Sequence, residues 1–530
     1  MNEVDSVVVV GGGSAGWMSA ATIAKLFPNK KVTVIESPDI PVVGVGESTI
    51  GGIREWMHLL DIDEADFMAY TNAAYKLSIK FTDFYEKGDG GFHYPFGKPY
   101  LHGSRLGLNM WHLKKALNPE LPVDSYARTW FPAVTLSEKN KFNLNKNEEF
   151  DNFDPQADVA YHFDATLFGA WLRDKFCIPL GVTLIKDNVE KIDVNEDGIE
   201  LLTLSSGETV TADLYIDCTG WKSLLLGEAL KEPFDSFSEM LPNNRAWATQ
   251  VPYTDPEKEM EPYTNCTALG NGWAWNIPLW SRIGTGYVYS DKYTTPEKAL
   301  EEFKEYLNSD SMTIPDAERV TDNLEFKDIK FRVGIHHRTW VKNVVGIGLA
   351  AGFIEPLESN GLYTVHVFLT KLAKCLLRPK VHQWEKDAYN ASVRSLFNDL
   401  AEFVALHYAL SMRTDTEYWQ TISKKTFSQN LVDLKPNLSV GFFDLASRKM
   451  LLQEYNTQGG IHCIATGMNY FPLDINSVRS WELYTKSDYS IWVKEFDEMR
   501  DELMEKWDVN ADNSPSLYQY LKEKYHAKEV

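Results

Sequence analysis

The first 36 residues carry the pattern that most limits how this chain can fold. A β-branched run at 7–10 leads into Gly11-Gly-Gly-Ser-Ala-Gly16, and a helical pattern follows at 17–27. A second β-branched run at 31–35 ends at Glu36. Glycines in a G-x-G-x-x-G loop let the backbone approach a pyrophosphate, the helix N-terminus attracts its charge, and an acid at this spacing binds ribose hydroxyls. This order of elements predicts an α/β fold that binds a dinucleotide, and it argues against a simple tight turn.

Two later segments extend the same prediction. A hairpin is expected at 198–212, and the strand that follows it runs into Thr219-Gly220. Residues 344–352 again read as a strand followed by small residues. Together with the first segment they resemble the FAD-binding fold of flavin monooxygenases. The loop at 46–51 could lie against the flavin, or it could be an ordinary connection. No second G-x-G-x-x-G loop follows a strand, so no separate NAD(P)H site is expected.

Composition excludes several classes of protein. The chain of 530 residues has a formal net charge of −22, which disfavours nucleic acid and anionic membrane surfaces as partners. Its five cysteines are scattered without a CxxC pair, so neither a disulfide framework nor a cysteine metal site is expected. No signal peptide and no apolar run of transmembrane length is found, and we expect a cytoplasmic protein.

Two stretches in the first 300 residues suggest a cavity. Trp273 and Trp275 lie in Gly272-Trp-Ala-Trp-Asn-Ile-Pro278, and their side chains share one face if the segment is extended. They could pack into a core or line a cofactor cavity. Lys76 and Lys80 alternate with apolar residues, and the plain alternative is two solvent lysines on an edge strand. Residues 92–97 and the region around Trp111 are expected to be aromatic loops.

The second half combines one possible anion site with helices. Glu358 precedes Asn360 and Gly361, which stand at the start of an apolar helix at 362–377. Asn360 is a candidate N-cap, and backbone N–H groups at such a helix terminus could bind an anion. Glu358 could alternatively only favour the helix dipole. Helices are expected over 384–419 and through most of 415–530. We therefore predict a FAD-binding domain at 1–380 with pocket insertions, and a helical subdomain at 381–530 packed on it.

Taken together, the motifs resemble the flavin-dependent halogenases, the family that includes the tryptophan halogenases. The motifs are Gly11-x-Gly13-x-x-Gly16, Gly46-Glu47-Ser48-Thr49-Ile50, Tyr75-Lys76 with Ile79 and Phe81, Gly272-Trp273-x-Trp275-x-Ile277-Pro278, Glu355-Pro356-Leu357-Glu358-Ser359, and His407-Tyr408 through Asp415-Thr416. The resemblance implies an oxidoreductase that uses FADH2 from a separate reductase, with O2 and a halide, to form hypohalous acid. That acid would halogenate an electron-rich, indole-like substrate by electrophilic substitution.

The resemblance also implies roles for individual residues. The catalytic residues would be Lys76, which carries or orients the oxidant, and Glu358, which polarises it or accepts the ring proton. Asn360 and Gly361 would hold the chloride, bromide or iodide, and Asn360 stands where the family often has Thr. The cofactor-binding residues would be Gly11, Gly13, Ser14, Ala15, Gly16, Glu36, Gly46, Glu47, Ser48, Val189, Leu349 and Leu362. The substrate-binding residues would be His93, Phe96, Trp111 and Ser359.

Two other functions stay open on the sequence. A flavin-dependent aromatic hydroxylase would share the FAD domain but bring its substrate against the flavin. A non-catalytic protein that binds flavin or an aromatic ligand would share the fold alone. The substrate, the ring position, the preferred halide and a possible homo-oligomer are not decided by the sequence.

Overall fold

The computed structural model divides the chain into two compact units. The first comprises Met1–Ala73, His162–Asn244 and Ile329–Leu400, and the second comprises Ala74–Tyr161, Arg245–Asp328 and Ala401–Val530. The structure describes residues 3–40, 46–105, 107–144, 150–151, 153–155, 157–309, 323–378, 380–424, 460–470 and 475–527. Each unit thus draws on three separated segments, whereas the predicted domains follow sequence order. The predicted boundary at 380 stays a prediction.

The first unit is built on a six-stranded sheet with the order β20-β21-β12-β1-β2-β8. Neighbouring strands from β21 to β8 run parallel, and β20 closes one edge as an antiparallel partner of β21. The strands are β1 (Ser6–Val10), β2 (Lys31–Glu36), β8 (Thr183–Lys186), β12 (Leu214–Asp217), β20 (Trp340–Val341) and β21 (Val344–Gly346). All four valines of β1 are buried, as expected of a central parallel strand. The predicted α/β class is confirmed.

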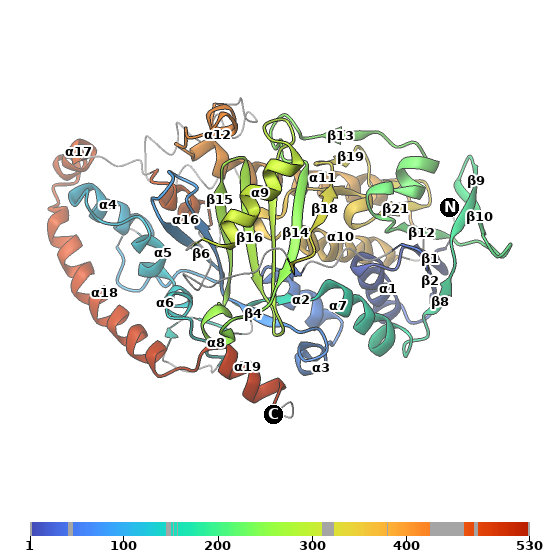
Figure 1. The fold of residues 1–530 in the computed structure, drawn as a ribbon, viewed down its shortest axis with the longest axis horizontal. Coiled ribbons are helices and arrows are strands. Elements are labelled where there is room, and N and C mark those ends of the chain that lie inside the picture. The colour runs from blue at the N-terminus through green and yellow to red at the C-terminus, as the bar shows by residue number, and fades with distance from the viewer. Residues whose placement is uncertain are drawn as a thin grey trace. The chain divides into compact units, whose positions relative to one another are not determined.

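Both faces of this sheet are covered. On one face, Val8, Val10 and Ile35 share a hydrophobic cluster with Leu202 and Leu204 of the predicted hairpin. That hairpin consists of β10 (Gly198–Leu204) and β11 (Thr209–Val210), and β9 (Val189–Asn195) adds a third strand beside β10. The helices α1 (Ser14–Leu26) and α10 (Gly361–Leu376) pack against each other, and Figure 1 shows both beside the parallel strands. Parallel strands need such cover because both of their faces are apolar.

The remaining elements of the first unit are short. They are β3 (Glu47–Ser48), α2 (Gly52–Leu59), α3 (Glu64–Met68), α7 (Ala165–Trp171), a π-helical continuation η2 (Leu172–Cys177), η3 (Gly220–Lys222), η4 (Leu224–Ala229), β13 (Phe234–Ser236), β19 (Gly334–His336), η6 (Gly348–Ala350), β22 (Gly352–Phe353) and η7 (Pro356–Glu358). Three elements contain a unit boundary: β7 (Ala160–Phe163), β18 (Lys327–Lys330) and α11 (Gln383–Leu410).

The second unit is built on an extended sheet in which β14-β17-β16-β15-β5-β6 are consecutive, with β18 at the β14 edge. The strands are β5 (Ser78–Thr82), β6 (Gly91–Pro95), β14 (Arg245–Val251), β15 (Tyr263–Leu269), β16 (Gly272–Pro278) and β17 (Ile283–Tyr289). On one face, Ala274 and Tyr287 pack against Phe303 and Leu307 of α9 (Pro296–Leu307). This face therefore forms a core with a single amphipathic helix.

Helices complete the second unit. They are α4 (Asn109–Leu117), α5 (Ser125–Trp130), α6 (Pro132–Glu138), α8 (Pro256–Glu259), α12 (Glu417–Ile422), α16 (Gly460–Gly467), α17 (Ile475–Thr485), α18 (Tyr489–Asp512) and α19 (Leu517–Tyr525), with the short strand β4 (Ala74–Lys76) at its start. The expected helical C-terminal part is confirmed in the described residues, and residues 425–459 of that expectation lie outside them. No helix in the described part of the chain is long and apolar enough to cross a membrane.

One sequence-based expectation is wrong. Residues 91–95 form β6, not an aromatic loop, and Trp111 lies in the helix α4. β6 pairs with β5 in the register Phe92 to Phe81 and Tyr94 to Ile79. The alternation of aromatic and other side chains thus marks a strand with one apolar face, a signal that the nearby glycines and Pro95 obscured.

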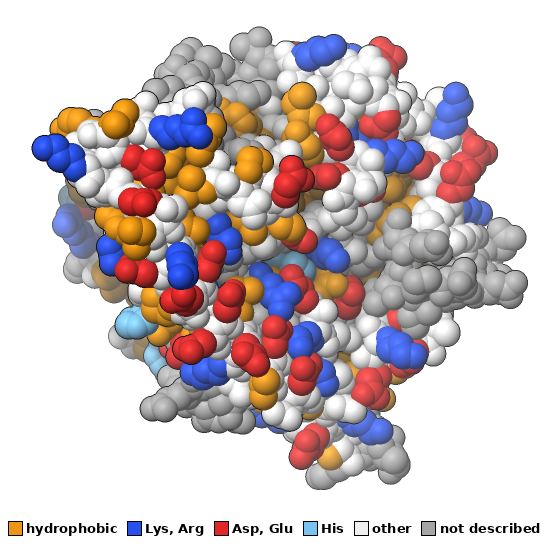
Figure 2. All heavy atoms as spheres, turned by 90° about the vertical axis from the view of Figure 1, so that its left-hand side faces the viewer, with side chains coloured by type: hydrophobic (Ala, Val, Ile, Leu, Met, Phe, Trp, Pro, Cys, Tyr) orange, Lys and Arg blue, Asp and Glu red, His pale blue; other side chains and the backbone are white. Residues whose placement is uncertain are grey.

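Acidic and basic side chains are interspersed on the face shown in Figure 2. The basic side chains on that face do not gather into a continuous patch, which is what binding to a phosphate backbone would require. This distribution agrees with the net charge of −22.

Candidate active site

The loops after three neighbouring strands of the first unit converge at the carboxyl ends of β1, β12 and β21. Gly11 has a φ of +117°, and a Cβ at this position would lie 2.3 Å from the Cys218 carbonyl oxygen. Gly348 has a φ of +64°, and a Cβ there would lie 2.9 Å from the Cβ of Ala15. Only glycine permits these approaches. The three segments predicted to share one nucleotide domain therefore meet at one edge of the sheet, where ligands bind in such folds.

The first turn of α1 is shaped for an anion. Gly13 is its N-cap residue, no side chain caps the helix, and a Cβ at Gly13 would meet nothing within 4 Å. Ser14, Ala15 and Gly16 follow as the first three helical residues. Free N–H groups at a helix N-terminus, without a side chain in front of them, suit a pyrophosphate. The predicted loop therefore fits the phosphates of FAD.

Glu36 stands at the end of β2, and its side chain reaches back over this loop. A Cβ at Gly12 would lie 2.3 Å from the Glu36 Cγ. The carboxylate accepts a hydrogen bond from the Trp17 indole at 3.3 Å and lies 3.7 Å from the Arg173 guanidinium. A carboxylate over the glycine loop is placed to accept ribose hydroxyls. The donor set at the helix and the acceptor at Glu36 together fit the adenosine half of a dinucleotide.

The segment at Gly46 is tied to the first unit through β3. Gly46 has a φ of +96°, and Glu47 and Ser48 pair with Phe163 and His162 of β7. The Ser359 hydroxyl donates to the Ser48 hydroxyl oxygen at 3.0 Å. Burial raises the pKa of Glu47 to about 7, so its carboxyl is partly protonated at neutral pH. The hydrogen bond from Ser359 to Ser48 therefore joins the loop at 46–51 to the turn at 355–361, which the sequence singled out separately.

A short turn at 355–361 positions Glu358, Ser359 and Asn360. Glu358 closes the 3-10 turn η7 and is buried, and Ser359 has a left-handed φ of +56°. Asn360 is the N-cap residue of α10, as predicted, but its side chain does not cap the helix. Its amide instead donates to the Glu355 carbonyl oxygen at 3.4 Å, because the chain folds back through Ser359. The N-terminus of α10 is thus left to its backbone groups, with Gly361 open to its surroundings.

One buried pair next to this turn was not predicted. Glu355 is buried, and its carboxylate accepts a hydrogen bond of 2.6 Å from the Asn243 amide. The sequence showed Glu355 only as part of a motif and gave no sign of its partner, which is distant along the chain. The pair holds the start of the turn that carries Glu358.

Lys76 is fully buried in the second unit, at the end of β4. Its ammonium lies 5.1 Å from the centre of the Phe96 ring. Lys80, by contrast, is half-buried, with its ammonium 5.8 Å from the Tyr263 ring. The alternative of two solvent lysines on an edge strand is therefore wrong, because β5 has a strand on each side and Lys76 is enclosed. Burying an ammonium is costly, so its position needs a reason.

The other predicted substrate residues of the second unit are also buried. His93 lies on the face of the sheet opposite Phe92, and its Nδ1 is 2.9 Å from the Ser78 hydroxyl. Burial, with Lys80 adding to the effect, lowers the pKa of His93 to about 3, so the ring is neutral. The Trp111 indole donates to the Ser125 hydroxyl at 3.1 Å. Of these residues, Phe96 is the one seen to lie against Lys76.

The two tryptophans of β16 share a face, as predicted from their spacing. Their ring centroids are 6.1 Å apart and both side chains are buried. Trp275 pairs with Gly286 on β17, where a Cβ would lie 2.2 Å from the indole. A glycine on the neighbouring strand thus makes room for one of the two rings.

The predicted site residues fall into two groups. The first unit contains all the cofactor and halide candidates together with Glu358 and Ser359, and the second contains Lys76, His93, Phe96 and Trp111. Among the cofactor candidates, Val189 packs against the hydrophobic cluster under the sheet, Leu349 is partly exposed in η6, and Leu362 is buried in α10. Each of these roles stays a prediction.

The parallel sheet, its glycine loop and the acid after β2 define the class of the protein, an α/β flavoprotein with the FAD-binding fold. The chain belongs to the tryptophan halogenase family, whose model matches residues 6–447. It is thus one of the flavin-dependent halogenases, enzymes of the oxidoreductase type. The predicted family and enzyme class are confirmed.

Individual relatives cover nearly the whole chain. Tryptophan 6-halogenase ThaL of Streptomyces albogriseolus is 32% identical over 502 residues, which is 89% of this chain and 90% of that protein. The apo structure of VirX1 is 36% identical, with a TM-score of 0.89 over 99% of this chain and 100% of that chain. The tryptophan 6-halogenase SttH from Streptomyces toxytricini is 31% identical, with a TM-score of 0.84 over 98% and 99% of the two chains.

Proposed function

We propose that this protein is an FADH2-dependent halogenase that forms hypohalous acid from O2 and a halide and halogenates an electron-rich, indole-like aromatic compound. Two of the relatives named above are described as tryptophan 6-halogenases. The observation that carries the proposal furthest is the complete burial of Lys76. Burying an ammonium costs free energy that its contacts must offset, and reaction with an oxidant inside the protein is a function that such a buried amine would serve.

In this proposal the first unit holds the cofactor and the halide. The N–H groups of Ser14, Ala15 and Gly16 bind the pyrophosphate, and Glu36 binds the ribose. Reduced FAD bound there would supply two of the four electrons that reduce O2, and the halide would supply the other two as it is converted to hypohalous acid, with the second oxygen atom leaving as water. Backbone groups at Asn360 and Gly361 hold the halide, because the Asn360 side chain is engaged with Glu355 and does not occupy the start of the helix.

Two side chains carry the substitution chemistry in this proposal. Lys76 holds the hypohalous acid by a hydrogen bond or carries the halogen on its amine, and so directs it to the ring. Glu358 polarises the oxidant or accepts the ring proton that the halogen replaces. The left-handed turn at Ser359 and the hydrogen bond from Ser359 to Ser48 fix the position of Glu358. His93, Phe96, Trp111 and Ser359 are proposed to contact the substrate.

The decisive assay supplies reduced FAD through a generic flavin reductase and offers a panel of aromatic compounds with chloride, bromide or iodide. We expect indole and related electron-rich rings to gain the halogen that is present, identified by its isotope pattern in mass spectrometry. Electron-poor rings such as benzoate should not react, because the substitution is electrophilic.

The same assay without halide is the control. A product that gains only oxygen, equally with and without halide, would identify an aromatic hydroxylase and refute the proposal. Ligand binding without turnover under any reductant would leave only a binding protein.

A further inference from the structure

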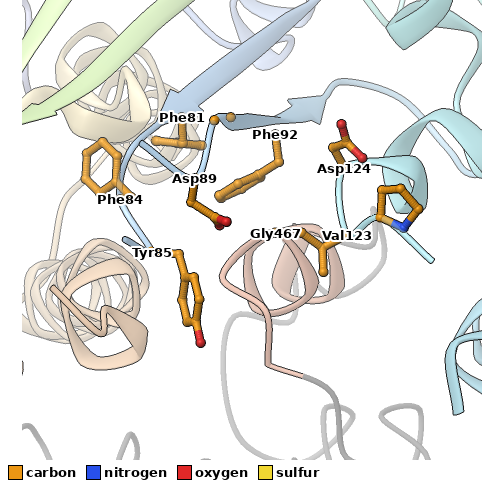
Figure 3. A pocket seen from close by; sticks show the side chains of 11 residues that line it. Phe81, Phe84, Tyr85, Asp89, Phe92, Val123, Asp124 and Gly467 are labelled. Carbon is orange, nitrogen blue, oxygen red and sulfur yellow. The ribbon is translucent and has the colours of Figure 1, made fainter. Parts of the chain in front are cut away.

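A pocket of about 250 Å³ lies in the second unit, at the end of the sheet where β5 and β6 are joined. Its walls come from the end of β5, the turn that follows, the loop before α5 and the last residue of α16 (Figure 3). The lining residues are Phe81, Phe84, Tyr85, Asp89, Gly90, Gly91, Phe92, Pro122, Val123, Asp124 and Gly467. None of the residues predicted to bind cofactor, halide or substrate is among them.

Aromatic rings form the floor of this pocket. Phe81, Phe84 and Phe92 are buried, with ring centroids 5.6 Å apart for Phe81 and Phe84 and 5.4 Å apart for Phe81 and Phe92. Gly467 allows the close approach of α16, since a Cβ there would lie 2.1 Å from the Phe92 ring. Rings packed in this way are held in fixed orientations and present a rigid apolar surface to a ligand.

Two carboxylates also line the pocket. Asp89 comes from the β5–β6 turn and Asp124 from the loop before α5, and Figure 3 shows the Asp89 carboxylate between Tyr85 and Phe92. None of the lining residues is a Lys, Arg or His. Throughout the described ranges, no ion pair or hydrogen bond to either carboxylate is found. The pocket therefore combines aromatic faces with negative charge, and no cation among its lining residues neutralises that charge.

The pKa of Asp89 reflects the concentration of negative charge in the pocket. Its pKa is raised by partial desolvation and by the nearby carboxylates of Glu86, Asp83 and Asp124. Repulsion between like charges raises the pKa of a carboxyl group, and a cation bound among these carboxylates would reduce the repulsion. Lys87 lies in the same turn but does not line the pocket.

We propose that this pocket binds an organic cation, namely an ammonium group carried on an apolar body. The ammonium would pair with Asp89 and Asp124 and lie near the aromatic rings, which attract cations through their faces. The apolar body would occupy the floor formed by Phe81, Phe84 and Phe92. An anion would be repelled by the carboxylates, and a neutral ligand would gain nothing from them.

This site goes beyond the proposed halogenase function and is distinct from Lys76. Phe81 comes five positions after Lys76 along a largely extended chain, which corresponds to about 16 Å at the rise of a β-strand. The lysine is at the end of β4, whereas Phe81 lies next to the turn that leads to β6. Binding here can therefore be tested without halogenation.

The experiment titrates the full-length protein with FAD against para-fluorophenethylamine and follows the ligand by fluorine NMR. The matched neutral probe is 2-(para-fluorophenyl)ethanol, which replaces the ammonium by a hydroxyl. We expect saturable binding of the amine and at least about tenfold weaker binding of the alcohol, a difference of about 1.4 kcal/mol. Raising the ionic strength should weaken the binding of the amine and leave the alcohol nearly unaffected.

Variants locate the site. Asp89→Asn should weaken amine binding several-fold, and Asp89→Asn with Asp124→Asn should abolish it, while Asp501→Asn on an exposed part of α18 and Lys76→Ala should leave it unchanged. Val123→Trp, which fills the pocket, should block both probes. Equal binding of the two probes, unchanged amine binding in the double variant, or loss of binding in Lys76→Ala would each overturn the proposal. Circular dichroism confirms that each variant is folded.

Discussion

At the scale of single residues, the most informative observation is the burial of a lysine side chain. Lys76 is fully buried, whereas Lys80, four residues further on, is half-buried beside Tyr263. The sequence shows two lysines four residues apart that would share one face of a strand, and it does not indicate which of them is buried. Their surroundings differ because β4 ends at Lys76 and β5 begins at Ser78, so the two side chains do not continue one regular face.

Replacing the buried lysine should separate chemistry from cofactor binding. In Lys76→Ala we expect halogenation to fall at least about 100-fold, because the variant lacks the group that is proposed to direct the oxidant. The affinity for FAD should stay within about twofold, since the cofactor candidates lie in other segments. Product formation by mass spectrometry and flavin fluorescence titration measure the two quantities.

Lys80→Ala is the matched control, since it removes the same functional group four residues away. It should retain halogenation within about threefold, as expected for a partly exposed side chain. Full halogenation by Lys76→Ala would show that this lysine does not take part in the chemistry.

At the scale of elements, the tryptophan motif in β16, one of those that resemble the halogenases, also determines how this strand packs. Trp273 and Trp275 share one face of the strand, and Ala274 faces α9 on the other. The packing of Trp275 also depends on the neighbouring strand, where Gly286 lies opposite this ring. The motif therefore extends to a glycine that the spacing of the tryptophans does not reveal.

A methyl group at that glycine should disturb the sheet. Gly286→Ala places a Cβ 2.2 Å from the Trp275 ring, and we expect a loss of about 1–3 kcal/mol in the free energy of unfolding from overpacking. Trp275→Phe in the same chain should recover part of this loss, because the smaller ring leaves room. Denaturant unfolding of the two single variants and the double variant measures the coupling, and strictly additive effects would show that the contact is not the cause.

At the scale of the whole molecule, the sequence predicts a single dinucleotide site. The sequence has a single G-x-G-x-x-G loop, and a later glycine-containing strand end, at Gly348, packs against the first turn of α1. In the proposed function, this later segment lines the FAD site rather than a separate site for a nicotinamide. An enzyme of the proposed kind would depend on another protein for its reduced flavin.

Turnover should accordingly require a second component. With FAD, O2, halide and indole present, we expect NADH to be oxidised by this protein no faster than in buffer, and halogenation to begin only when a flavin reductase is added. NADH absorbance at its long-wavelength band follows the first quantity, and product mass spectrometry follows the second. Rapid NADH oxidation by this protein alone would mean that it contains a nicotinamide site.

The features that the sequence determines by itself either depend on a few neighbouring residues or belong to a short motif. The strand, glycine loop, helix and acid of residues 7–36 could be predicted, because the backbone freedom of glycine and the periodicity of side chains act over a few residues. The shared face of Trp273 and Trp275 and the hairpin at 198–212 follow from the same local rules. The resemblance to the halogenases rests on motifs of the same kind.

Only the tertiary structure decides which distant residues meet. The burial of Lys76, the hydrogen bond between Asn243 and Glu355, the room that Gly286 leaves for Trp275, and the approach of Asp89 and Asp124 around one pocket all join residues far apart in sequence or on different strands. The strand at 91–95 was not predicted for a related reason. Its pairing with β5 shows which of its side chains lie on the apolar face of the sheet, and the sequence does not show this pairing. Burial and electrostatics depend on the sum of all neighbours, and one chain segment does not specify its neighbours.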